Sequence, residues 1–123
     1  MNDEKSTAQQ VKDKGIELEA IHGVDNVAAV AYKGGGYAFF RAPSGEEHDS
    51  FSLYMTDDDA SQETKTKTTR SYAKSCFVCT LSGETFDQVC EKAGVVWFKG
   101  PVMRALGKIS GGKEAAPTVF SFR

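Results

Sequence analysis

Long apolar runs are missing from this sequence of 123 residues. No stretch approaches the ~20 apolar residues that a membrane-spanning helix needs, so no membrane partner is expected. The first six residues, Met-Asn-Asp-Glu-Lys-Ser, are polar and lack the apolar core of a secretory signal peptide. These absences lead us to expect a cytoplasmic protein.

Cysteine and histidine are scarce, with three and two copies. An odd cysteine count without a secretory signal favours free thiols in a reducing compartment. Cys76 and Cys79 form a C-x-x-C pair, but a structural zinc site needs four ligands. Cys90 and the distant His22 and His48 complete such a set poorly. We expect thiols packed in a core, with a thiol- or metal-dependent enzyme as the alternative.

Nucleotide-binding motifs are missing as well. Gly107-Lys108 follows Gly100 at a spacing that differs from that of a phosphate-binding loop. Ile109 also stands where such a loop has Ser or Thr. The glycines at 34–36 predict a tight turn and do not match a dinucleotide-binding fingerprint. No cofactor site is therefore predicted.

The acidic residues do not predict a catalytic or metal site either. Residues 57–59 are three aspartates in a row, which lack the alternating ligands of a calcium loop and fit a helix cap better. His48 lies between two carboxylates, but no serine or cysteine nucleophile has a recognisable elbow near it. We therefore expect a solvated helix face at His48 and no enzymatic activity.

Charge is present in both signs, but it is divided unevenly along the chain. The net charge of −2 argues against a nucleic-acid partner. Residues 1–64 carry 13 acidic and 5 basic side chains, whereas residues 65–123 carry 4 acidic and 10 basic ones. Such an asymmetry either marks interaction surfaces, including those of a homo-oligomer, or draws the two halves together within one fold.

The length and the average composition predict one domain of the α+β class. Residues 1–14 are polar and predict a flexible leader or a short exposed helix. The alternating segment 15–21 and the apolar runs 27–32 and 37–41 predict strands. We therefore expect an antiparallel hairpin or three-stranded sheet over residues 15–42, followed by three to four short packed helices.

The first of these helices has a clear start. Pro43 ends the strand, and Ser44 with Glu47 forms the pattern of a capping box. An apolar stripe at helical spacing predicts that the helix ends near Thr56. Residues 57–60 then offer a cap for a second helix, and the threonine-rich stretch 61–69 is either an exposed helical half or a mobile loop.

The second half predicts further helices. One apolar face runs from Tyr72 to Cys79, and Ser82 is the expected N-cap of a helix that ends at Gly94. Pro101 is expected at the first position of a last helix that closes at residues 111–112. This gives a single domain over residues 15–112. The apolar tail 113–123 either docks back as a strand or is an exposed binding segment.

Taken together, the short motifs over residues 33–110 resemble the small tail assembly chaperone-like proteins of tailed bacteriophages and prophages. The resemblance rests on an aromatic strand ending in a Phe-Arg-x-Pro motif, a polar helix, and a helix ending in a Cys-Val-Val-like stretch. The segments that carry it are Phe40-Arg41-Ala42-Pro43, Phe51, Asp57, Arg70-Ser71-Tyr72, Cys76-Phe77-Val78, the helix of residues 82–92, and Gly100-Pro101 with Leu106 and Ile109. The threonine-rich segment and the long C-terminal tail depart from the family pattern.

The resemblance implies a non-enzymatic role in the cytoplasm of the host cell. Proteins of this family are thought to coat the long, apolar-rich tape measure protein until the tail tube polymerises around it. An apolar groove that holds an amphipathic helix would serve that purpose. The candidate groove residues are Tyr54, Met55, Trp97, Phe98, Met103 and Leu106, although a single tryptophan such as Trp97 is also a common core residue.

An alternative is a phage or bacterial structural or accessory protein with the same fold. Such a protein would be a virion component or an inhibitor of a host protein. The identity of the protein partner and the oligomeric state distinguish this alternative from the chaperone hypothesis.

Overall fold

Helices and strands alternate along residues 6–111, the part of the chain that the computed structural model describes. Three strands form one antiparallel sheet, and helices cover it, so the α+β class is confirmed. The elements in chain order are α1 (Thr7–His22), β1 (Val27–Tyr32), β2 (Gly36–Arg41), α2 (Gly45–Met55), α3 (Gln62–Cys76), β3 (Phe77–Thr80), α4 (Phe86–Ala93), α5 (Val95–Trp97), the π-helical turn η1 (Phe98–Val102) and α6 (Met103–Gly111).

The sheet has the order β1-β2-β3, with β2 in the middle. β1 and β2 form a hairpin in which Ala29 lies opposite Phe39. The turn between them uses Gly34 and Gly35 at φ angles of 100° and 86°, which side chains other than glycine rarely adopt. β3 joins the other edge of β2 only after two helices have intervened, and a bulge between Phe39 and Phe40 interrupts this second pairing.

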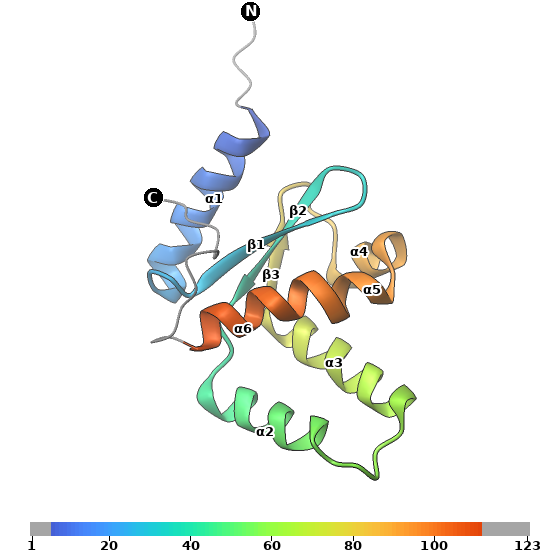
Figure 1. The fold of residues 1–123 in the computed structure, drawn as a ribbon. Helices are drawn as coiled ribbons and strands as arrows, with labels where there is room; N and C mark the ends of the chain where they lie inside the picture. The colour runs from blue at the N-terminus through green and yellow to red at the C-terminus, as the bar shows by residue number, and fades with distance from the viewer. Residues whose placement is uncertain (1–5, 112–123) are drawn as a thin grey trace, which may run out of the picture.

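The two faces of β2 are covered by different helices. Phe39 and Phe40 are both fully buried, and neighbouring side chains of a strand point to opposite faces. Phe39 packs with Val11 and Leu18 of α1. Phe40 belongs to the larger core, to which α3, α4, α5, η1 and α6 contribute. Figure 1 shows α6 crossing the sheet, α1 beside the hairpin, and the α2–α3 pair extending away from the sheet.

The strand expected over residues 15–21 is wrong. This segment belongs to α1, which begins at Thr7 after the N-cap Ser6, whose hydroxyl accepts a hydrogen bond from the Gln9 amide at 3.2 Å. The sheet therefore follows the first helix, and its third strand comes from β3. Val11 and Leu18 lie seven residues apart, two helical turns, and both are buried, so the helical period decides the structure here.

Three boundaries in the second half also differ from expectation. The face expected to run to Cys79 as a helix ends at Cys76, because the following residues pair with β2 as β3. The N-cap of α4 is Thr85, not Ser82, and Gln88 completes its capping box. Pro101 lies inside η1, where it follows earlier helical turns and does not start a helix.

Other expectations are confirmed. The capping box of Ser44 and Glu47 starts α2, which ends at Met55 with Thr56 as its C-cap. The threonine-rich stretch is helical and forms the first half of α3, but its N-cap is Ser61, so the cap expected within residues 57–60 is wrong. Gly94 follows the last residue of α4 at a φ of 83°. The apolar tail expected over 113–123 lies outside the described residues.

Arg41 connects the sheet to α2 and α3. Its guanidinium donates to both carboxylate oxygens of Glu47, at 3.0 and 3.1 Å, and to the carbonyl of Ser75 at 2.8 Å. The hydrogen bonds from Arg41, followed by those from the Ser44 backbone, lower the pKa of Glu47 to about 2. The acidic start of α2 is thus held against the end of α3.

We predict that Glu47→Gln destabilises the protein by about 1 kcal/mol at neutral pH, a modest value because a partly exposed ion pair is screened by water. A lowered pKa in the folded state stabilises above the unfolded value of 4.5, so the loss should shrink as the pH falls from about 4.5 towards about 2. Urea unfolding of both proteins across this range measures the difference. Glu46→Gln, on the exposed side of the same turn, is the control and should stay within about 0.5 kcal/mol of the parent.

Candidate functional site

The six residues predicted to line a groove do not share one exposed surface. Trp97, Phe98 and Leu106 are 4%, 3% and 1% exposed and belong to the large core. The indole nitrogen of Trp97 donates to the carbonyl of Ala31 at 3.0 Å, which ties α5 to β1. Met103 is half-buried and packs against the same core. Three of the six residues therefore support the fold from within.

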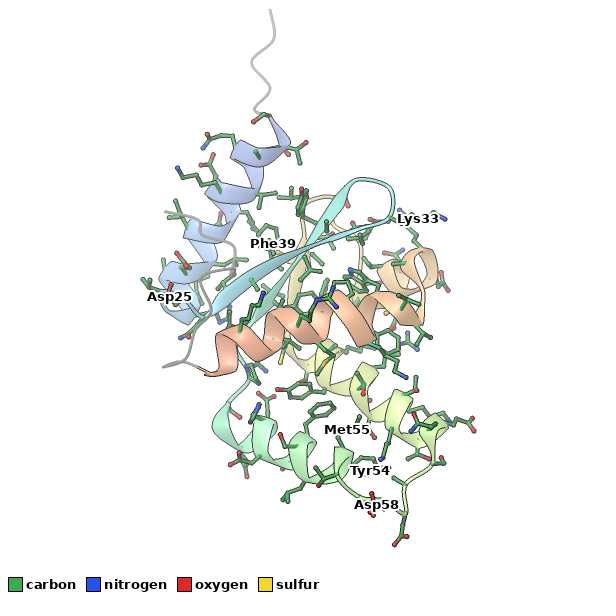
Figure 2. All side chains as sticks on the ribbon, in the orientation of Figure 1. Asp25, Lys33, Phe39, Tyr54, Met55 and Asp58 are labelled. Atoms are coloured by element: carbon green, nitrogen blue, oxygen red, sulfur yellow. The ribbon has the colours of Figure 1, made fainter. Side chains whose placement is uncertain are left out.

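Tyr54 and Met55, the other two predicted groove residues, lie in the last turn of α2. Both are half-buried, and Figure 2 shows them at the end of α2 that lies next to α3. The Thr69 hydroxyl approaches the Met55 sulfur at 3.8 Å. One turn earlier, Phe51 stacks on Tyr72 with ring centroids 4.2 Å apart. The inner face of α2 is thus occupied by α3 of the same chain.

An open hollow of about 310 Å³ lies between α3 and the junction of α4 with α5. We call it the α3–α5 hollow. Its apolar lining comes from α4, α5 and η1, and its polar edge comes mainly from α3. The lining residues are Thr66, Lys67, Arg70, Cys90, Glu91, Gly94, Val95 and Phe98.

Two adjacent valines are exposed here, and the first of them, Val95, lines the hollow. Val95 and Val96 are 49% and 80% exposed, whereas the next two residues of the chain are buried. The turn at Gly94 explains the contrast, since its φ of 83° sends the chain from α4 directly into α5. Single exposed apolar residues are common, but an adjacent pair beside a partly apolar hollow is typical of a binding surface.

Basic side chains border the α3–α5 hollow. Lys99 donates to the hydroxyl of Thr66 at 3.3 Å, so its charge faces a neutral group there. Arg70 donates to the Asp87 carboxylate at 2.8 Å. Lys67 lies 3.9 Å from the Glu63 carboxylate in an exposed pair, and Glu91 is the acidic residue of the lining. The hollow thus combines apolar surface with cations at its edge.

A second, larger hollow of about 580 Å³ lies beside the β1–β2 turn, between the start of α1 and the loop before α4. Its polar groups satisfy one another. The Glu84 carboxylate accepts from the Tyr32 hydroxyl at 2.5 Å and from Ser82 at 3.1 Å, and it pairs with Lys92. The hydrogen bond from Lys92, followed by that from Tyr32, lowers the pKa of Glu84 to about 2. This cluster joins the loop before α4 to β1.

The cysteines are divided between the two sides of the sheet. Cys76 is buried in the larger core, whereas Cys79 packs with the residues beneath α1. Burial raises the pKa of both thiols and that of Cys90, which disfavours the reactive thiolate. Among residues 6–111, no cluster of three or more histidine, cysteine or acidic side chains is arranged to hold a metal ion.

The signal for the exposed surface was only partly visible in the sequence. Val95–Phe98 is the most apolar tetrad of the chain, and the groove inferred from the family resemblance includes its two aromatic residues, Trp97 and Phe98. The structure buries Trp97 and Phe98 and exposes the two valines.

Comparison with protein-family models, with curated proteins and with solved structures finds no match for this chain. Within the described residues, no helix has the length and apolar character required to cross a membrane.

We predict that Cys76 reacts with iodoacetamide about tenfold or more slowly than Cys90 in the folded protein, because Cys76 is fully buried and Cys90 is half-buried. Peptide mapping by mass spectrometry after timed alkylation measures each thiol separately. In denaturant the difference should disappear. Equal rates in the folded protein would contradict the burial of Cys76.

Proposed function

We propose that this chain is a non-enzymatic bacteriophage assembly protein, similar to tail assembly chaperones, that binds an apolar-rich phage protein such as the tape measure. The resemblance over residues 33–110 points to this class of protein. The proposed place of action is the cytoplasm of the host cell, because tail assembly takes place there. Nucleic acid and membrane are not proposed as partners.

The observation that carries the proposal is the exposed pair Val95 and Val96, of which Val95 lines the α3–α5 hollow. Val96, which is 80% exposed, would gain most from being covered, since full burial of a valine contributes about 1.5 kcal/mol. A single helix of a partner could lay its apolar stripe over the two valines and place one side chain in the hollow. This is helix-in-groove recognition, which suits an amphipathic helix of a tape measure protein.

The surface proposed here replaces most of the groove inferred from sequence. The buried residues of the predicted groove would act indirectly, by holding α5 and α6 on the sheet so that the valines face outward. These residues are Trp97, Phe98 and Leu106. Tyr54 and Met55 would stay with α3. A virion component or an inhibitor of a host protein could use the same surface, and the identity of the bound protein separates these alternatives.

We predict that Val96→Asp abolishes partner binding while the fold is retained, because the side chain is largely exposed and a carboxylate cannot be buried unpaired without cost. The tagged chain is used to capture proteins from host cells that produce the phage proteins, and mass spectrometry identifies what is bound. Recovery of a long, coiled, apolar-rich phage protein by the parent but not by Val96→Asp is the expected result.

Ile21→Ser is the matched control, since Ile21 is 70% exposed but lies on α1, outside the hollow. It should capture the partner as the parent does. Equal capture by Val96→Asp would exclude the exposed valine pair as the binding surface. Capture of a virion or host protein in place of the tape measure would overturn the chaperone assignment.

A further inference from the structure

The outer face of α2 is uncovered and acidic. No residue of α2 is buried, and Leu53 is 74% exposed. Glu46 and Asp49 lie seven and four residues before Leu53, so all three share one side of the helix. The stretch 42–60 contains six acidic residues and no lysine or arginine, and His48 lies 3.7 Å from Asp49. α2 therefore presents one leucine within a field of negative charge.

The region that follows the α3–α5 hollow has the opposite character. Residues 95–111 contain Lys99, Arg104 and Lys108 and no acidic residue. Lys99 and Arg104 are exposed, and Lys99 bonds to a threonine hydroxyl. Lys67 adds an exposed cation from α3. Glu91 in the lining and the partners of Lys67 and Arg70, which are Glu63 and Asp87, reduce this positive charge locally.

The ion pairs leave the charge asymmetry of the two halves in place. Arg41 and Glu47 both belong to the acidic half, and Arg70 and Asp87 both belong to the basic half. These two pairs do not join the halves to each other, whereas the exposed Glu63–Lys67 pair does cross the boundary between them. Complementary surfaces of opposite charge favour association and accelerate it.

The α2 helix of one molecule cannot reach the α3–α5 hollow of the same molecule. α2 packs on the side of α3 that carries Thr69 and Tyr72. The hollow lies on another side of α3, which carries Thr66 and Arg70. An α2 helix in the hollow must therefore come from a second copy.

We propose that the outer face of α2 from a second copy docks on the α3–α5 hollow. Leu53 of one copy covers Val95 and Val96 of the other, and Glu46 and Asp49 face Lys67 and Lys99. Because the two surfaces are different, the contact is head-to-tail, and a pair of bound copies still offers one free α2 face and one free hollow. The chain then forms short linear or closed assemblies that cover the valines. A phage partner would compete for the same hollow, but self-association does not depend on such a partner.

Sedimentation velocity of the purified full chain tests the proposal. The average mass should rise above the 13.3 kDa of the monomer as the concentration increases. It should fall back when salt is raised from about 0.05 M to about 1 M, because the screening length shrinks to about 3 Å. A monomer at every concentration up to about 1 mM would overturn the proposal.

Two charge-reversed variants sharpen the test. Variant one is Glu46→Lys with Asp49→Lys, and variant two is Lys67→Glu with Lys99→Glu. Each should self-associate about tenfold more weakly than the parent, because reversal turns attraction into repulsion. An equimolar mixture should associate again, since the altered α2 of variant one matches the altered hollow of variant two, and the unaltered α2 of variant two matches the unaltered hollow of variant one. Failure of the mixture to associate, while the parent does, would overturn the pairing.

Leu53→Ser and Ile21→Ser form a matched pair of exposed substitutions on different helices. Leu53→Ser should weaken self-association, whereas Ile21→Ser should leave it unchanged. Circular dichroism and urea unfolding verify that every variant is folded. An equal effect of both substitutions would point to non-specific association and contradict the proposal. These measurements use the purified chain alone, so their failure leaves the partner-capture result with Val96→Asp unaffected.

Discussion

The burial of β2 on both faces is the constraint on which the rest of the structure depends. Phe39 and Phe40 are adjacent and have no exposed surface, so each face of the strand needs its own cover. α1 supplies the cover for Phe39 and the helices from α3 onward supply it for Phe40. A single strand thus requires helices from both ends of the described chain, and β1 and β3 must flank it to satisfy its backbone groups.

The burial of Phe40 also explains which residues stay exposed and can contact a partner. The ring of Trp97 lies 6.0 Å from that of Phe40, and the Phe86 ring lies 6.4 Å from it. Trp97 and Phe86 are therefore buried in this cluster and cannot contact a partner directly. The apolar side chains that stay exposed among residues 6–111 are smaller, and they include Val95 and Val96 near the hollow and Leu53 on α2. The proposed binding surface is therefore made of residues that the core does not need.

The charge distribution gives a similar division of roles. Arg41 binds the carboxylate of Glu47 and the carbonyl of Ser75, which attaches α2 to α3. The Glu84 cluster attaches the loop before α4 to β1 through the Tyr32 hydroxyl. The remaining acidic face of α2 and the basic residues near the hollow are left on the surface. Because α3 lies between the acidic surface and the basic surface within one molecule, the proposed contact between them forms only between two molecules.

The elements with strong local signals could be predicted from the sequence alone: the β1–β2 hairpin, the capped start of α2, and the end of α4 at Gly94. These depend on contacts within a few residues, so short patterns predict them. Only the tertiary structure decided that residues 15–21 are helical and that residues 77–80 complete the sheet, because both depend on pairing or packing with β2. The same reason explains the candidate site. Which members of the Val95–Phe98 tetrad are exposed is decided by how α5 is seated on the core, and no local pattern contains that information.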